Sequence, residues 1–303
     1  MLAVTSGPAP VRFRPMPLPE LLDELFRLYR NYFGLIVGVA LIVVLPGLIW
    51  TLITGTYRLT ANSYATLFQP SGSTTFGPSN LTSGQITNML GLIGLGAIGA
   101  VVLLPFSIGA VYRAVTDVSL GRPATVGSVL RETLARYLPL LGLIALVFVI
   151  FVVWVIALII GSILLILPGL AVFCVGIYFS IRWSLAVAAM MAEDIGPVEG
   201  LRRSWNLVAG MWWRTFGILL VVTILQAIIG FALGLFFGLI VGAALSGDLR
   251  LAVTSVGSTL LNAIISPITT IAIVLLYFDL RVRKEGLDLD QLAQQTSPGP
   301  APA

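Results

Sequence analysis

Six stretches of this chain are long and apolar enough to cross a membrane, and they constrain the fold more than any other feature. A transmembrane helix needs about 20 predominantly apolar residues to cross roughly 30 Å of hydrocarbon. Hydrophobic residues make up 58% of the sequence and charged residues 10%. A soluble domain contains roughly 25% charged residues. The predicted spans are Phe33–Ile53, Asn88–Tyr112, Leu138–Ile160, Ile163–Met190, Thr215–Leu245 and Leu251–Phe278.

These spans predict an all-α fold, a polytopic membrane helix bundle with six transmembrane helices in three hairpins. The membrane domain is expected to cover residues 17–289. We expect disorder in the N-terminal segment, residues 1–16, and in the Pro/Ala-rich tail, residues 290–303. Residues 54–86 are rich in Ser, Thr, Gly, Pro and Asn and predict a polar surface loop. The proline-rich N-terminal segment has no apolar core, so we do not expect a signal peptide.

The distribution of basic residues predicts which side of the membrane each loop faces. Short cytoplasmic loops of membrane proteins carry an excess of Lys and Arg. If the N-terminus lies inside, fifteen basic residues fall inside and only Arg58 and Arg250 fall outside. Both termini are therefore expected to be cytoplasmic, in a multi-pass protein of the cell (inner or plasma) membrane. Arginines outnumber lysines sixteen to one, which is typical of a GC-rich genome and favours a prokaryotic source.

An amphipathic helix is predicted directly before the first, third and fifth spans. In "LPELLDELFRLYRNYFGLIVG", leucines and tyrosines fall on one helical face, and acids, arginines and an asparagine fall on the other. The stretches "TVGSVLRETLARYLPLLGLIA" and "GPVEGLRRSWNLVAGMWWRTFGILL" divide in the same way. Each helix is expected to lie in the cytoplasmic interface, before an outward span and a returning span. The chain is therefore interpreted as three parallel units.

Arginines and tryptophans gather in "GLRRSWNLVAGMWWRTFGILLVV", residues 200–222. Such interleaving is compatible with a nucleic-acid surface, but before an apolar span it favours a helix at the membrane surface. Tryptophan rings favour the headgroup level, and each arginine near an anionic surface contributes about 1 kcal/mol. We expect membrane lipids and a membrane or cytoplasmic protein as partners, and no nucleic acid. The predicted headgroup-binding residues are Arg27, Arg30, Arg131, Arg136, Arg202, Arg203, Trp205, Trp212, Trp213 and Arg214.

Four polar residues are predicted within or close to the hydrophobic spans. A charge inside a span indicates a functional site, but Arg182 could instead reach the cytoplasmic headgroups or pair with Asp279. Gln226 and Asn262 could line a substrate path, although interhelical hydrogen bonding is the favoured interpretation. A stripe of small residues on the fifth span predicts close helix packing, and it consists of Gly230, Gly234, Gly238 and Gly242.

The sequence contains few residues suited to catalysis or cofactor binding. It has no histidine and a single cysteine, Cys174, which excludes His-based catalysis, a disulfide framework and zinc-ligand spacing. Glu193 and Asp194, with Glu199 nearby, form an acidic cluster between two spans. Such carboxylates could hold a divalent metal or share a proton, but a solvated loop before a helix is the favoured interpretation. We expect no cofactor, no metal and no enzymatic activity.

Three stretches resemble a known family: "LLDELFRLYRNYFGLIVGVALIVVLP", "EGLRRSWNLVAGMWWRTFGILL" and "LLYFDLRVRKEGLDL". They are similar to the membrane domain of glycerophosphoryl diester phosphodiesterase-like membrane proteins of prokaryotes. The resemblance covers residues 17–289. In that family the membrane domain can precede a soluble phosphodiesterase barrel. Many members carry the membrane part only, and their activity is not established. No catalytic part is expected in this chain, so the resemblance implies a membrane domain, and the family name does not indicate an activity.

Two functions are consistent with these features. The favoured one is a non-enzymatic membrane scaffold, anchor or lipid-organising protein that binds anionic lipid headgroups through its cytoplasmic arginine and tryptophan residues. The alternative is a transporter or permease component for a lipid-like or small amphipathic molecule, with Arg182, Gln226 and Asn262 along its path. A weaker third hypothesis is a membrane enzyme that uses Glu193 and Asp194.

Overall fold

The computed structural model describes residues 14–57, 83–164 and 166–286, and all the regular elements in these ranges are α-helices. Residues 1–13, the 290–303 tail and most of the 54–86 loop lie outside the described residues. The helices are α1 (Leu18–Asn31), α2 (Phe33–Thr54), α4 (Ser83–Ser119), α5 (Val126–Ala135), α6 (Tyr137–Leu164), α7 (Ile166–Trp183), α8 (Ala186–Glu193), α9 (Pro197–Val208), α10 (Trp212–Ala244), α11 (Gly247–Ile265) and α12 (Pro267–Glu285).

Six helical segments of the described chain have the length and apolar composition needed to cross a membrane. The apolar side chains of the first five segments are largely exposed, as expected where hydrocarbon surrounds a helix, whereas the sixth segment is more than half buried by protein. The prediction of an all-α, six-span membrane bundle is therefore confirmed. The segments are Phe33–Thr54, Leu90–Ser119, Tyr137–Gly161, Gly169–Glu193, Trp212–Ala244 and Gly247–Glu285.

Two predicted spans are interrupted in the structure. The fourth was expected to continue to Met190, but α7 ends at Trp183 and α8 begins at Ala186. The cause is Ser204 on α9, whose hydroxyl donates to the carbonyl of Arg182 at 2.7 Å and accepts from the amide of Leu185 at 3.1 Å. This hydroxyl takes up backbone groups that a continuous helix would pair internally.

The sixth predicted span is divided between α11 and α12. Pro267 occupies the first position of α12, where its missing N–H costs no helical hydrogen bond. Ser266, just before it, joins the two helices. The predicted span of 251–278 therefore lies within a longer helical pair covering 247–285.

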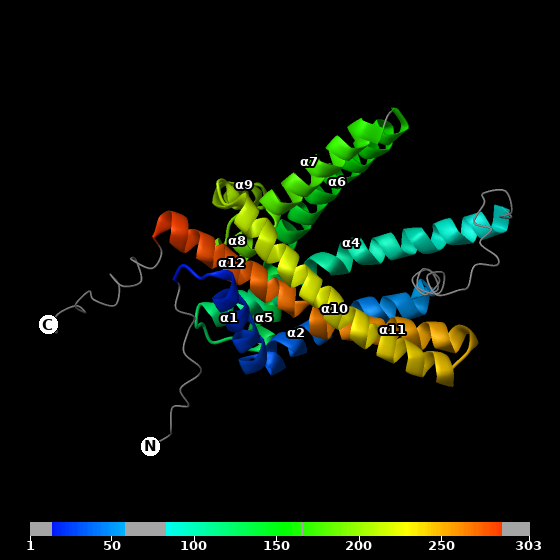
Figure 1. Cartoon of the computed structure of the whole chain (residues 1–303). Helices are drawn as coiled ribbons and strands as arrows, with labels where there is room; N and C mark the ends of the chain where they lie inside the picture. The colour runs from blue at the N-terminus through cyan, green and yellow to red at the C-terminus, as the bar shows by residue number, and fades with distance from the viewer. Residues whose placement is uncertain (1–13, 58–82, 165, 287–303) are drawn as a thin grey trace, which may run out of the picture.

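The helices radiate from one end of the molecule (Figure 1). Helices α1, α5, α8 and α9 lie at this end, around the C-terminal half of α12. From there the α6–α7 hairpin runs in one direction, and α10 with α11 runs in another. Helix α12 packs against α1, α4, α9 and α10. Because protein surrounds this helix, even its large residues Tyr277 and Phe278 are fully buried.

The three segments that were predicted to be amphipathic form the helices α1, α5 and α9. Their apolar faces pack mainly on protein: α1 contacts α12, α5 contacts α4, and α9 contacts α8. Leu21 and Leu25 of α1, Val129 of α5 and Val208 of α9 are fully buried. The apolar faces of α1, α5 and α9 are therefore buried by other helices of the same protein. The expected position of these helices in the membrane interface stays a prediction.

The joints between these helices and the following spans share one backbone conformation. Tyr32 links α1 to α2 with φ −115° and ψ 23°. Arg136 links α5 to α6 with φ −103° and ψ 13°, and Met211 precedes α10 with φ −117° and ψ 20°. These angles lie near the sparsely populated bridge region. Leu185, before α8, has similar angles (φ −94°, ψ 1°), so this conformation is not specific to the three joints, and the interpretation of the chain as three units stays a prediction.

The glycine stripe of α10 was predicted to allow close helix packing, and this prediction is wrong for three of its four members. A Cβ atom built on Gly230, Gly234 or Gly238 would meet no other atom within 4 Å. Only Gly242 has a neighbour, the Arg250 side chain at 3.3 Å. Three of the four glycines in this stripe therefore have no packing partner among the described residues.

Candidate functional site

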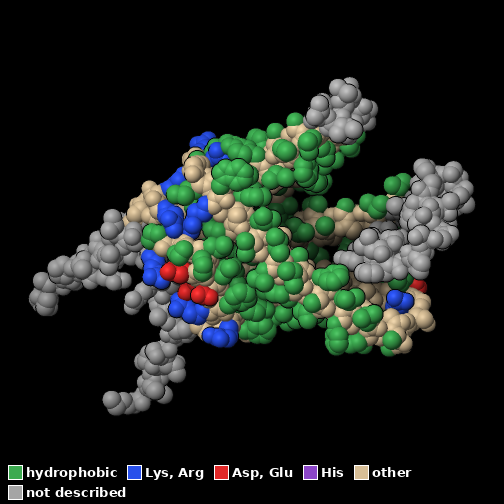
Figure 2. Space-filling view, viewed as in Figure 1, with side chains coloured by type: hydrophobic (Ala, Val, Ile, Leu, Met, Phe, Trp, Pro, Cys, Tyr) green, Lys and Arg blue, Asp and Glu red, His purple; other side chains and the backbone are tan. Residues whose placement is uncertain are grey.

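Charged side chains concentrate at the end where α1, α5, α8 and α9 meet (Figure 2). The rest of the visible surface is predominantly apolar. Three clusters of ion pairs lie at this end, centred on Arg113, Glu193 and Asp279. We refer to the whole region as the basic end.

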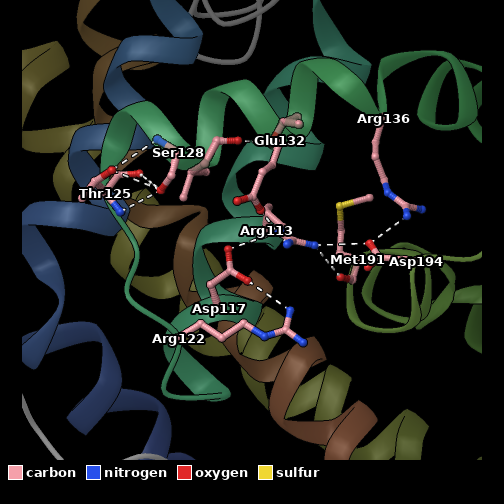
Figure 3. A network of polar contacts seen from close by, with 11 residues as sticks. Arg113, Asp117, Arg122, Thr125, Ser128, Glu132, Arg136, Met191 and Asp194 are labelled. Atoms are coloured by element: carbon pink, nitrogen blue, oxygen red, sulfur yellow. Dashed lines mark hydrogen bonds and ion pairs between the residues drawn. The ribbon is translucent and has the colours of Figure 1, made fainter.

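Arg113 on α4 is the centre of the first cluster (Figure 3). Its guanidinium contacts Asp117 at 3.1 Å, one turn along the same helix, and Glu132 of α5 at 2.5 Å. It also donates to the carbonyl of Met191 at 3.2 Å and lies 3.4 Å from Asp194, next to α8. One arginine thereby joins the first unit of the chain to the second.

Arg136 and Arg122 extend this cluster on opposite sides. Arg136 pairs with Asp194 at 2.9 Å, although it was predicted to bind lipid headgroups. Arg122 lies 3.6 Å from Oδ1 of Asp117, an oxygen that is buried and has no hydrogen bond to any described residue. Asp194 adopts the left-handed conformation with φ 56°, which Asp tolerates better than most residues. This backbone turns the chain after α8 and directs it toward α9.

Glu193 is the centre of the second cluster. It accepts hydrogen bonds from Arg203 of α9 at 2.7 Å and from the Tyr277 hydroxyl at 2.6 Å, and it lies 3.5 Å from Arg281. Arg203 also pairs with Glu285. Burial lowers the pKa of Arg203, but the hydrogen bonds that it donates to Glu285 and Glu193 outweigh this effect and raise the pKa above its usual value.

The sequence left two interpretations of Glu193 and Asp194 open, a metal- or proton-binding cluster and a solvated loop, and their contacts bear on both. Arginines, not other carboxylates, surround both residues. Among the described residues, no group of three His, Cys, Asp or Glu side chains could hold a metal ion. The favoured interpretation as a solvated loop is also incomplete, because Glu193 connects α8, α9 and α12 through its ion pairs and hydrogen bonds.

Asp279 on α12 is the centre of the third cluster and is fully buried. It accepts from Arg214 of α10 at 2.9 Å, from Arg283 at 3.1 Å and from the backbone N–H of Met16 at 2.8 Å. Arg214 also donates to the Met16 carbonyl. The segment before α1 is thereby fixed to α10 and α12, so the ordered chain begins before the predicted boundary at residue 17.

This arrangement corrects two predictions. Arg214 was expected to bind lipid headgroups, but it neutralises a buried carboxylate. Arg182 was offered as a partner of Asp279, but Arg214 and Arg283 occupy that role. An ionised carboxylate in such a buried position requires paired cations, since its desolvation cost is large.

Arg182 instead lies within a group of aromatic rings contributed by α7, α9 and α10. Its guanidinium donates to the Tyr178 hydroxyl at 2.6 Å and to the Trp205 carbonyl at 3.0 Å. The guanidinium carbon lies 4.4 Å from the centre of the Trp205 ring, a distance suited to a cation–π interaction. The Trp212 ring stacks on Tyr178 and on Phe216, with centroids 6.0 and 5.2 Å apart.

The predicted headgroup residues thus fall into different groups. Arg136, Arg203 and Arg214 are ion-paired within the protein. Trp205 and Trp212 belong to the aromatic group around Arg182. Arg27 is exposed and contacts Glu24 on its own helix. The remaining members of the predicted set are exposed, and no described carboxylate pairs with the arginines among them: Arg30, Arg131, Arg202 and Trp213.

The two uncharged intramembrane residues occupy separate positions. Gln226 of α10 accepts a hydrogen bond from Thr269 of α12, which is the interhelical bond that was favoured. Asn262 is exposed on α11, and its side chain makes no hydrogen bond to any described residue. No hydrogen bond links either side chain to Arg182. The hypothetical path through these three residues has no support from their contacts.

The carboxylate partners at the basic end were not predicted from the sequence. Three of them carry a local signal, because the partners are spaced four residues apart on one helix face: Arg113 with Asp117, Asp279 with Arg283, and Arg281 with Glu285. The long-range partners, such as Glu193 with Tyr277, depend on tertiary packing and have no signal at the level of spacing.

The fold and the basic end define a class: a multi-pass, all-α membrane protein whose described charges are mostly paired at one end. Comparisons with protein-family models, with curated proteins and with solved structures find no match.

Proposed function

We propose that this protein is a non-enzymatic membrane scaffold that organises anionic lipids at the cytoplasmic surface of a cell membrane. The basic end would face the cytoplasm, in agreement with the excess of arginine expected there. The three ion-paired clusters would make this end rigid. The exposed arginines would then attract anionic headgroups.

The observation that carries this proposal is the position of the exposed arginines at the basic end that have no described carboxylate partner. Arg30 lies on α1, Arg131 on α5 and Arg202 on α9, so each of the three amphipathic helices exposes one such arginine. Exposed apolar residues accompany them on the same helices, including Phe26 and Leu134, and Trp213 follows at the start of α10 with 78% exposure. Basic residues combined with exposed apolar groups favour binding at an anionic membrane surface.

The lipid shell around the protein tests this proposal. The full chain is extracted, with its neighbouring lipids, from membranes of phosphatidylcholine and phosphatidylglycerol in equal parts. The lipid composition of the extract is then compared with that of the whole membrane. We expect enrichment of phosphatidylglycerol around the wild type, and loss of this enrichment when Arg30, Arg131 and Arg202 are all replaced by glutamine.

The control is Arg250→Gln, which makes the same type of substitution at a single arginine at the far end of α10 and α11. The 33 residues of α10 separate this position from the basic end by about 50 Å. We expect the control to retain the enrichment. Equal enrichment in the triple variant and the wild type would contradict the proposed function.

A further inference from the structure

We propose that Arg182 and Lys284 form a site for the phosphate group of one anionic phospholipid, whose acyl chains lie against α7 and α10. This inference rests on the proposed function only in placing the basic end at the membrane surface. It differs from the proposed function because it names one defined site, and neither residue of this site is among the exposed arginines Arg30, Arg131 and Arg202.

Arg182 is held in place without a carboxylate. Its Nε and Nη2 atoms donate to the Tyr178 hydroxyl at 3.1 and 2.6 Å, and its Nη1 atom donates to the Trp205 carbonyl. All three acceptor contacts are neutral groups, and no described Asp or Glu side chain pairs with this guanidinium. A guanidinium has five N–H donors, so these contacts leave donors available for a ligand.

Lys284 supplies a second positive charge beside the first. Its Nζ atom donates to the carbonyls of Asn206, at 2.6 Å, and Ala209, and it forms no ion pair with a described carboxylate. The anchoring carbonyls of Trp205 and Asn206 belong to consecutive residues, so both cations meet at the C-terminal end of α9. The helix end offsets only about half an elementary charge. The pair therefore retains net positive charge.

The contrast with the rest of the basic end makes this pair unusual. Arg113, Arg203 and Arg214 are also held by several contacts, but each of them contacts at least one carboxylate. Arg182 and Lys284 are fixed by carbonyl and hydroxyl groups alone. The charges of Arg182 and Glu285 both act on Lys284, but Glu285 is itself paired with Arg203 and Arg281. A phosphate that accepts from both Arg182 and Lys284 would remove the repulsion between these two cations.

The surroundings of the pair suit a lipid better than a free anion. Tyr178, Trp205 and Trp212 pack around Arg182, and such rings favour the headgroup level of a bilayer. Helices α7 and α10 meet here, since the Trp212 indole donates to the Tyr178 carbonyl at 3.3 Å. From this contact the two helices run apart (Figure 1). Both expose apolar side chains beyond it: Leu170, Phe173 and Val175 on α7, and Leu220, Ile224 and Ile228 on α10.

Native mass spectrometry of the full chain in detergent tests this site. Phosphatidylglycerol is added at increasing concentration, and the first bound lipid is measured for the wild type and for the double variant Arg182→Gln/Lys284→Gln. Loss of two phosphate contacts should weaken the first binding step by about tenfold or more. The matched control Arg14→Gln/Arg250→Gln removes the same total charge at two exposed positions outside both proposed lipid sites and should bind the first lipid as the wild type does.

Two further measurements make the test of this site decisive: a single variant and a competition experiment. Since Arg182 connects α7 to α9, the double variant could lose its fold; the single variant Lys284→Gln changes an exposed side chain and should still weaken the first step severalfold. Phosphatidylcholine and inorganic phosphate serve as competitors, and neither should displace phosphatidylglycerol at equal concentration. Unchanged binding in Lys284→Gln, or displacement by inorganic phosphate, would overturn the site. The variant with Arg30, Arg131 and Arg202 all replaced by glutamine should still bind this first lipid. Failure of the proposed function and failure of this site would therefore be seen in different variants.

Discussion

Trp154 on α6 packs directly against Gly176 on α7, and its indole N–H donates to the carbonyl of Val172 at 2.9 Å. Trp50 and Gly99 make the same contact between α2 and α4, with the indole donating to the Leu95 carbonyl at 3.0 Å. In both hairpins the accepting carbonyl lies four residues before the glycine. Phe237 and Gly257 form the third such contact, between α10 and α11. One aromatic–glycine contact thus joins the two helices of each pair, a regularity expected if the chain consists of three repeated units.

Gly176→Ala should destabilise the protein by about 1–3 kcal/mol, the usual cost of overpacking. The added Cβ atom would lie 2.3 Å from the Trp154 ring, so the ring or the helix must move. Thermal unfolding in detergent measures the effect. Gly234→Ala is the matched control on a span, because its Cβ atom would meet nothing within 4 Å. We expect the control to be neutral or slightly stabilising, since Ala favours helix over Gly. Equal stability of both variants would show that the contact is not tight.

Asp279→Asn should lower the free energy of unfolding by about 3 kcal/mol, because it leaves two arginines without their buried partner. Arg214 and Arg283 both contact this carboxylate, which is fully buried. The loss should also release the segment around Met16, whose backbone N–H donates to Asp279. Limited proteolysis near the N-terminus should therefore become faster. Asp23→Asn, at an exposed position on α1, provides the control. A stable, protease-resistant Asp279→Asn variant would contradict this account.

Glu193 and Arg203 should show a favourable coupling of about 1 kcal/mol in a double-mutant cycle, as expected for a partly exposed ion pair. The side chains are 21% and 26% exposed, and the Arg203 Nε–H also donates to both carboxylate oxygens of Glu193. The cycle compares Glu193→Gln, Arg203→Gln and the combined variant by thermal unfolding. If the effects of the two single variants add up in the combined variant, the Glu193–Arg203 pair contributes no coupling energy. The loss of stability would then come from the other contacts of each residue, such as the one from Arg203 to Glu285.

The elements of this fold were largely predictable, because apolar stretches long enough to cross a bilayer leave little choice of structure. The interruptions after Trp183 and at Pro267 were less predictable. The first depends on a hydroxyl from another helix, that of Ser204, and only the second has a local cause. A proline within an apolar stretch does not by itself mark a break: Pro46 and Pro105 both lie inside uninterrupted helices.

The candidate site was harder to predict from the sequence than the fold was. An arginine near a span has the same local pattern whether it faces lipid headgroups or a carboxylate from a distant helix. Arg202 and Arg203 are adjacent, yet only Arg203 reaches Glu193 and Glu285. Helix geometry places neighbouring residues about 100° apart around the axis, so tertiary packing decides which one is paired.

The orientation of the basic end is open to a direct test by cysteine labelling. In a Cys174→Ser background, Arg131→Cys and Arg202→Cys place single thiols on exposed positions of α5 and α9. Arg250→Cys places one near the α10–α11 connection. A charged, membrane-impermeant maleimide added to intact cells should label only the Arg250→Cys variant, because the excess of arginine predicts a cytoplasmic basic end. After the membrane is made permeable, all three thiols should react, which confirms that each is accessible. Labelling of Arg131→Cys or Arg202→Cys in intact cells would reverse the proposed orientation and remove the basis for cytoplasmic lipid binding.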